Sequence, residues 1–178
     1  MTRASRVLAV TAILAAIQVA LFVSGFNTIP FPNGLKVTVL SIPATLAGVF
    51  AGPLAGAAVG AAFGLTSFAL ATTPLFQNPV IAIVPRLLIG PIASAVYRWA
   101  RRFNEAVALA LAGAAGAIAN TGLVLGFAAV IPGPTGGPYL SPSAAQEVAL
   151  TSMPWEALVA AIATLVVGLA ARAAMRKR

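Results

Sequence analysis

Long runs of apolar residues, separated by a few charged positions, dominate the pattern along this chain. No charged residue occurs from Val7 to Leu35, from Val37 to Pro85, or from Ala106 to Gln146. A transmembrane helix requires roughly 20 predominantly apolar residues, so each tract is long enough to cross a bilayer at least once. The pattern therefore predicts a protein that lies in a membrane.

Glycine and proline divide the long tracts into segments. Gly52-Pro53 separates two apolar segments, and proline suits the first turn of a new helix. Pro74 and Pro79 flank a polar loop, and the stretch Pro132–Pro138 is too rich in proline and glycine to be helical. We therefore expect an all-α polytopic protein, a single membrane domain over residues 1–178 that forms a six-helix bundle. The predicted helices lie at about 7–25, 36–51, 53–71, 80–99, 106–130 and 153–172.

The first segment could instead be a signal peptide, because Arg3 and Arg6 precede an apolar run. The run from Val7 to about Ser24 is long enough to span a bilayer, and further apolar segments follow it. We interpret it as a retained first helix.

Composition supports the membrane assignment and narrows the chemistry. Of 178 residues, 60% are hydrophobic and 8% are charged, whereas a soluble domain carries about a quarter charged residues. Cysteine and histidine are both absent, which removes disulfides, thiol catalysis, and the commonest metal ligand and general base. With only three acidic residues and no reactive pair among them, we expect no enzyme, no metal site and no cofactor.

The net charge of +8 indicates orientation rather than nucleic-acid binding. Six spans place Lys36 on one side of the membrane and Arg86 within a span. The remaining basic residues all fall on the opposite side: Arg3, Arg6, Arg98, Arg101, Arg102, Arg172, Arg176, Lys177 and Arg178. Because cytoplasmic loops are enriched in Lys and Arg, we expect both termini in the cytoplasm of a bacterial or archaeal cell, with the elaborate loops outside.

Small residues at four-residue spacing indicate close helix packing. They are Gly52, Gly56, Gly60 and Gly64 in the third segment, Ala112, Gly116 and Asn120 in the fifth, and Ala12, Ala16 and Ala20 in the first. For the third segment we favour packing inside the bundle. For the first, docking against a partner is an equal alternative, because a terminal helix often lies at the edge of a bundle.

Arg86 is the polar residue that most needs an explanation. It follows Pro85 in an apolar segment, and arginine at the centre of a span costs about 2.5–3.5 kcal/mol on insertion scales. One interpretation is a ligand-binding arginine near the outer mouth of the bundle. The other is a salt bridge to Glu156 that only ties two helices together.

Other candidate binding residues lie near the predicted outer side. Asn120 in the fifth segment either bonds across helices or lines a ligand cavity. Phe76, Gln77 and Asn78 offer stacking and hydrogen bonding, although a polar residue before Pro79 also suits a helix cap. Trp155 fits a stacking site as well as an interfacial aromatic belt.

In order and spacing, these segments resemble the substrate-binding S component of an energy-coupling-factor (ECF) vitamin transporter. The resemblance covers nearly the whole chain, and its most specific part lies between Pro43 and Arg86, where GVFAGPLAGAAVGAAFG precedes TTPLFQNPVIAIVPRLLIG. Ala12-Ile13-Leu14-Ala15-Ala16 is similar to the alanine motif that docks the transmembrane coupling subunit in this family. Ala119–Leu125 looks like members of the pantothenate and cobalamin branch.

The resemblance implies that the protein captures a vitamin outside the cell. It implies as partners the lipid bilayer, a transmembrane coupling subunit and two ATPases, since the chain has no nucleotide-binding motif. Pantothenate is the favoured substrate because Arg86 could meet its carboxylate, and cobalamin, riboflavin and folate remain open. A structural or assembly membrane protein without a ligand is the main alternative, followed by an intramembrane enzyme.

Overall fold

The computed structural model describes residues 2–30 and 36–176, which form six α-helices and one short β-hairpin. The predicted cytoplasmic residues Lys177 and Arg178 lie outside the described part. The helices are α1 (Arg3–Val23), α2 (Ser41–Ala51), α3 (Pro53–Ala69), α4 (Pro79–Ala100), α5 (Glu105–Val130) and α6 (Pro142–Arg176). The hairpin pairs β1 (Thr28–Pro30) with β2 (Lys36–Thr38) in antiparallel register.

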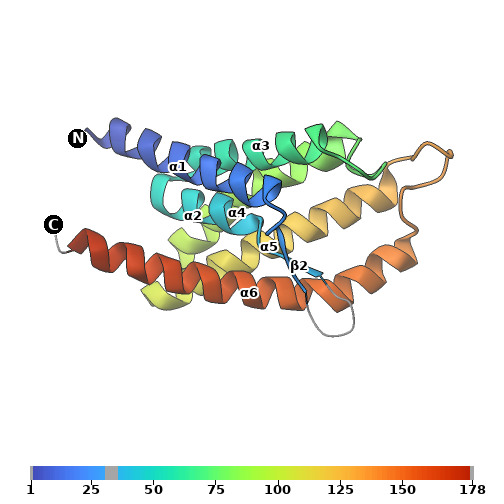
Figure 1. Cartoon of the computed structure of the whole chain (residues 1–178). Helices are drawn as coiled ribbons and strands as arrows, with labels where there is room; N and C mark the ends of the chain where they lie inside the picture. The colour runs from blue at the N-terminus through green and yellow to red at the C-terminus, as the bar shows by residue number, and fades with distance from the viewer. Residues whose placement is uncertain (1, 31–35, 177–178) are drawn as a thin grey trace.

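The helices run up and down the bundle, so that its two ends differ. The beginning of α1 and the end of α6 lie at the same end, and the longer connections over residues 70–78 and 131–141 lie at the other (Figure 1). We refer to these as the terminal end and the loop end. This arrangement agrees with the prediction that the elaborate loops lie on the side opposite the termini. The cytoplasmic location of the termini is a separate prediction.

Two predicted boundaries are wrong. The predicted helix at 36–51 begins only at Ser41, because residues 36–38 pair with β1 as a strand. The predicted loop up to Ser152 is shorter than expected, because α6 already begins at Pro142 and continues through Pro154. The Ser141 hydroxyl accepts a hydrogen bond from the Ala144 backbone N–H at 3.3 Å and caps this earlier start.

Four of the described helices, α1, α4, α5 and α6, are long and apolar enough to cross a membrane. The other two are shorter: α2 has 11 residues and α3 has 17. At 1.5 Å per residue, α2 is only about 16 Å long, roughly half the thickness of the hydrocarbon core. A polytopic membrane protein is therefore established, and six complete spans stay a prediction.

Glycines bring α2, α3 and α4 into backbone contact. A Cβ on Gly56 of α3 would lie 2.6 Å from the Gly90 Cα of α4 and 2.8 Å from the Gly48 Cα of α2. Gly60 and Gly64 also face the α4 backbone, at Arg86 and Ile83. The predicted internal packing of the third helix is thus confirmed. Gly52, at φ +101°, instead forms the turn between α2 and α3.

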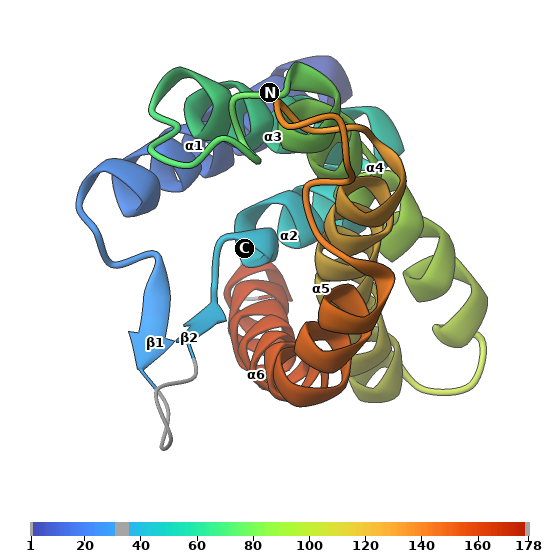
Figure 2. The same cartoon turned by 90° about the vertical axis from the view of Figure 1, so that its right-hand side faces the viewer.

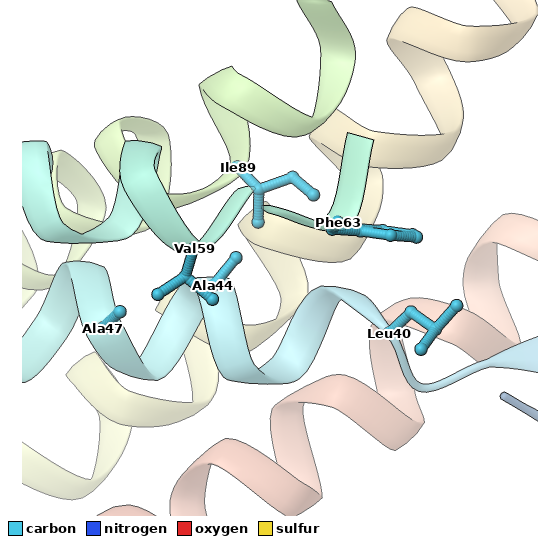
Figure 3. Packing of buried hydrophobic residues seen from close by; sticks show 6 residues of the cluster. All are labelled: Leu40, Ala44, Ala47, Val59, Phe63 and Ile89. Atoms are coloured by element: carbon cyan, nitrogen blue, oxygen red, sulfur yellow. The ribbon is translucent and has the colours of Figure 1, made fainter. Parts of the chain in front are cut away.

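Apolar side chains fill the space around this crossing. Leu40, Ala44, Ala47, Val59, Phe63 and Ile89 form one buried cluster (Figure 3). Helix α1 covers the cluster with Leu14, Ala15, Leu21 and Phe22 and leaves its other side exposed. The hairpin follows α1 and lies beside α6 (Figure 2).

A polar cluster joins three helices at the terminal end. Arg172 of α6 forms an ion pair with Glu105 of α5, with 2.6 Å between Nε and Oε1. The Tyr97 hydroxyl of α4 donates to the same Oε1 at 2.7 Å and accepts from Nη2 of Arg172. The Arg172 guanidinium also lies 6.0 Å from the ring centroid of Phe50 on α2.

Candidate functional site

A cavity of about 370 Å³ is lined by residues toward the loop end of the bundle. Its wall is formed by the end of α1, the hairpin, the last turns of α3, the connection that follows α3, and parts of α4, α5 and α6. Phe22, Leu40, Phe63, Val124 and Leu125 supply much of its apolar lining. Among the predicted binding residues, Phe76, Arg86, Asn120 and Glu156 line this cavity.

Arg86 is held in place by its own helix and by two aromatic rings. Pro85 has no backbone N–H, so it leaves the carbonyl of Ile81, four residues earlier, without its usual helical donor. Nη1 of Arg86 donates to that carbonyl at 2.7 Å. The guanidinium carbon lies 5.1 Å from the ring centroid of Phe63 and 4.7 Å from that of Phe76, within cation–π range. The side chain is only 4% exposed, and its Nε has no hydrogen-bond partner.

Glu156 supplies the opposite charge from α6. It is 6% exposed, and its two carboxylate oxygens accept different hydrogen bonds. The backbone N–H of Thr38 on β2 donates to Oε1 at 3.4 Å, and the Thr121 hydroxyl on α5 donates to Oε2. The carboxylate thereby links α6 to α5 and to the hairpin.

Arg86 and Glu156 do not form an ion pair in the part of the chain that the structure describes. The predicted alternative, in which Arg86 serves only to tie two helices through Glu156, is therefore wrong for this structure. Two buried groups of opposite charge face one cavity, and each is held by other partners.

Asn120 lines the same cavity from α5. It is 5% exposed, and its Oδ1 has no hydrogen-bond partner. A buried amide oxygen without a partner is costly unless a ligand or water satisfies it. Of the two predicted fates of Asn120, the arrangement favours the cavity over a bond between helices.

Three predicted residues do not line this cavity. Asn78 caps α4, since its Oδ1 accepts from the Val80 backbone N–H at 3.0 Å. Gln77 is exposed in the turn before α4, and Trp155 is 42% exposed on α6. The sequence thus indicated these positions by residue type, but Asn78 serves as a helix cap, and Gln77 and Trp155 are exposed outside the cavity lining.

Several lining residues were not predicted from the sequence. Thr38 and Thr121 hold Glu156, and Phe63 packs against Arg86. The β-branched run Val37-Thr38-Val39 was a signal for a strand that an otherwise apolar tract concealed. Phe63 carried no signal of its own, because a phenylalanine on an apolar helix is usually ordinary packing.

Ala12, Ala16 and Ala20 are exposed on α1. The residues through which α1 packs, including Leu14 and Phe22, lie on its opposite side. The small side chains form a flat face that no other described part of this chain covers.

Comparison with known protein families agrees with this arrangement. No curated protein sequence matches the chain. Residues 6–171, however, match the model of the family described as the ECF transporter, substrate-specific component. This family comprises membrane subunits of a transporter rather than enzymes, and it implies a small-molecule substrate and a coupling module with ATPases. The chain therefore belongs to the family of substrate-specific components of ECF transporters.

Proposed function

We propose that this subunit captures a vitamin or related small molecule in the cavity at the loop end and delivers it through an ATPase-driven coupling module. One observation carries the proposal: the cavity contains Arg86 and Glu156, both buried and not paired with each other. Charged groups in a membrane bundle are costly and usually mark substrate or ion pathways. In a substrate-specific transport subunit, a bound ligand accounts for them.

The distribution of basic residues supports the proposed sidedness. Arg98, Arg101, Arg102 and Arg172 all lie toward the terminal end of the bundle. The positive-inside rule favours a cytoplasmic terminal end, so the cavity would receive its ligand from outside.

Partner docking belongs to α1 in this proposal. Its exposed alanines, Ala12, Ala16 and Ala20, allow another transmembrane helix to approach closely. We propose that this face binds the transmembrane coupling subunit, which connects the chain to two ATPases.

Pantothenate is the proposed substrate within the vitamin class. Its carboxylate would bind Arg86, and a cavity of about 370 Å³ suits a molecule of its size better than the much larger cobalamin. Riboflavin and folate are the alternatives to be tested beside it. The competing structural role treats Arg86 and Asn120 only as contacts between helices, and the described residues offer it no Arg86–Glu156 ion pair.

Thermal stability of the detergent-purified protein, measured with a panel of vitamins, tests the proposal. A ligand that binds only the folded state adds about 2.7 kcal/mol at a hundredfold excess over its Kd. We expect a large shift with one vitamin, and with pantothenate first. A folded protein that no vitamin stabilises would support the structural alternative.

A further inference from the structure

The hydrogen bonds of Arg86 and Glu156 leave each group with unused capacity toward the cavity. Glu156 accepts two protein hydrogen bonds, although a carboxylate has about four lone-pair sites. Arg86 donates one, to Ile81, although a guanidinium has five N–H donors. A buried charge that is only partly satisfied is unfavourable, and a ligand group of matching polarity relieves that penalty.

The lining of the cavity is largely apolar, with Phe22, Leu40, Val124 and Leu125 among its residues. An apolar lining with a few convergent polar groups fixes the orientation of a ligand by its polar ends. Of the two charged residues in the lining, Arg86 is a pure donor and Glu156, when ionised, is a pure acceptor.

We infer that the cavity selects a dipolar ligand, with an acidic group on Arg86 and a hydroxyl or ammonium donor on Glu156. Glu156 is then a second specificity-determining residue, which recognises the donor end independently of the carboxylate that Arg86 recognises. This inference rests on the proposed function and deepens it.

Each end of the ligand contributes separately to selectivity. A ligand that lacks the acidic group leaves Arg86 buried without its partner, and one that lacks the donor does the same to Glu156. Sites built to hydrogen-bond a polar group reject analogues that lack it far more strongly than apolar pockets reject a missing methylene. We expect at least about a tenfold loss of affinity for either deletion.

Three ligands of similar shape separate the two ends. Pantothenate has a carboxylate at one end and two hydroxyls at the other. Pantothenol replaces the carboxylate with an alcohol, and N-(3,3-dimethylbutanoyl)-β-alanine keeps the carboxylate but lacks both hydroxyls. Titration calorimetry measures the affinity of the purified full chain for each of the three ligands. The affinity for pantothenate divided by that for each analogue then gives one selectivity ratio for each end of the ligand.

Each of the variants Arg86→Gln and Glu156→Gln should abolish one of the two ligand preferences and leave the other unchanged. Arg86→Gln should bring pantothenate and pantothenol to within about threefold, and Glu156→Gln should do so for pantothenate and the deoxy analogue. Glu147→Gln is the matched control, because Glu147 is an exposed carboxylate on the same helix outside the cavity lining. Its two ratios should equal those of the unaltered protein.

The outcomes separate this inference from the proposed function. If a vitamin binds but Glu156→Gln leaves its affinity and both ratios unchanged, the inference is overturned while capture stands. The inference is also overturned, while capture stands, if an uncharged vitamin such as riboflavin is the only ligand. If no vitamin binds the folded chain, both the inference and the proposed function fail.

Discussion

Single residues set the spacing of the helices that carry the site. Gly60 of α3 lies directly against the backbone of Arg86 on α4, so the absence of a side chain at Gly60 lets this part of α4 lie close to α3. At this scale the sequence was informative: Arg86 and Asn120 stood out as polar residues in apolar segments, and both line the cavity. Phe63, which packs against Arg86, and Thr38, which donates to Glu156, could not be predicted, because contacts between distant elements depend on how those elements cross.

Replacing Gly60 with alanine should destabilise the protein by about 1–3 kcal/mol, because the new Cβ would overlap the Arg86 carbonyl oxygen. Gly126→Ala on α5 is the matched control, since a Cβ there meets nothing within 4 Å. Thermal unfolding in detergent should leave that control within about 1 kcal/mol of the unaltered protein. Equal stability of the two variants would contradict the close approach of α3 and α4.

The helices were predicted well from the length of the apolar tracts and from the glycines and prolines that divide them, and less well at several of their ends. Gly52-Pro53 marked the turn between α2 and α3 correctly. The start of α6 was placed too late, although Ser141-Pro142 is a typical N-cap followed by proline at the first helical position. The nearby proline- and glycine-rich loop concealed that signal. The hairpin was missed because its second strand joins a long apolar tract.

The polar cluster at the terminal end should couple α5 to α6 energetically. In a double-mutant cycle with Glu105→Gln and Arg172→Gln, we expect a coupling free energy of up to about 1 kcal/mol. The value is small because the two side chains are 36% and 39% exposed, which weakens the ion pair. Urea or thermal unfolding of the four proteins measures it.

Arg98 provides the control for this cycle, because it is an exposed arginine of α4 without a described ion pair. Combined with Glu105→Gln, Arg98→Gln should be additive. If the effects of Glu105→Gln and Arg172→Gln on the free energy of unfolding were also additive, the polar cluster would not join the helices.

At the scale of the whole molecule, the apolar tracts predicted a polytopic membrane protein, and the order of the motifs predicted its family. The branch of the family and the number of complete spans stay predictions. A helix as short as α2 shows why: the apolar tract around it is long enough for a span, but part of that tract forms a strand. The length of an apolar tract limits the number of membrane crossings but does not determine it.

Orientation is testable because the chain contains no cysteine. We expect Thr135→Cys, in the exposed connection before α6, to react with a membrane-impermeant maleimide in intact cells. Phe103→Cys, between α4 and α5, should react only after permeabilisation. The reverse labelling pattern would place the termini outside and contradict the positive-inside assignment.

The crossing of Gly48, Gly56 and Gly90 has a genetic consequence. Every other amino acid carries a Cβ, and a Cβ at any of the three positions would overlap the backbone of a neighbouring helix. No missense allele at one of these codons is conservative, and a second substitution at another cannot restore the space that the first removes. The packing therefore constrains all three codons to glycine, and changes in the ligand-site residues have to be accommodated around an unchanged crossing.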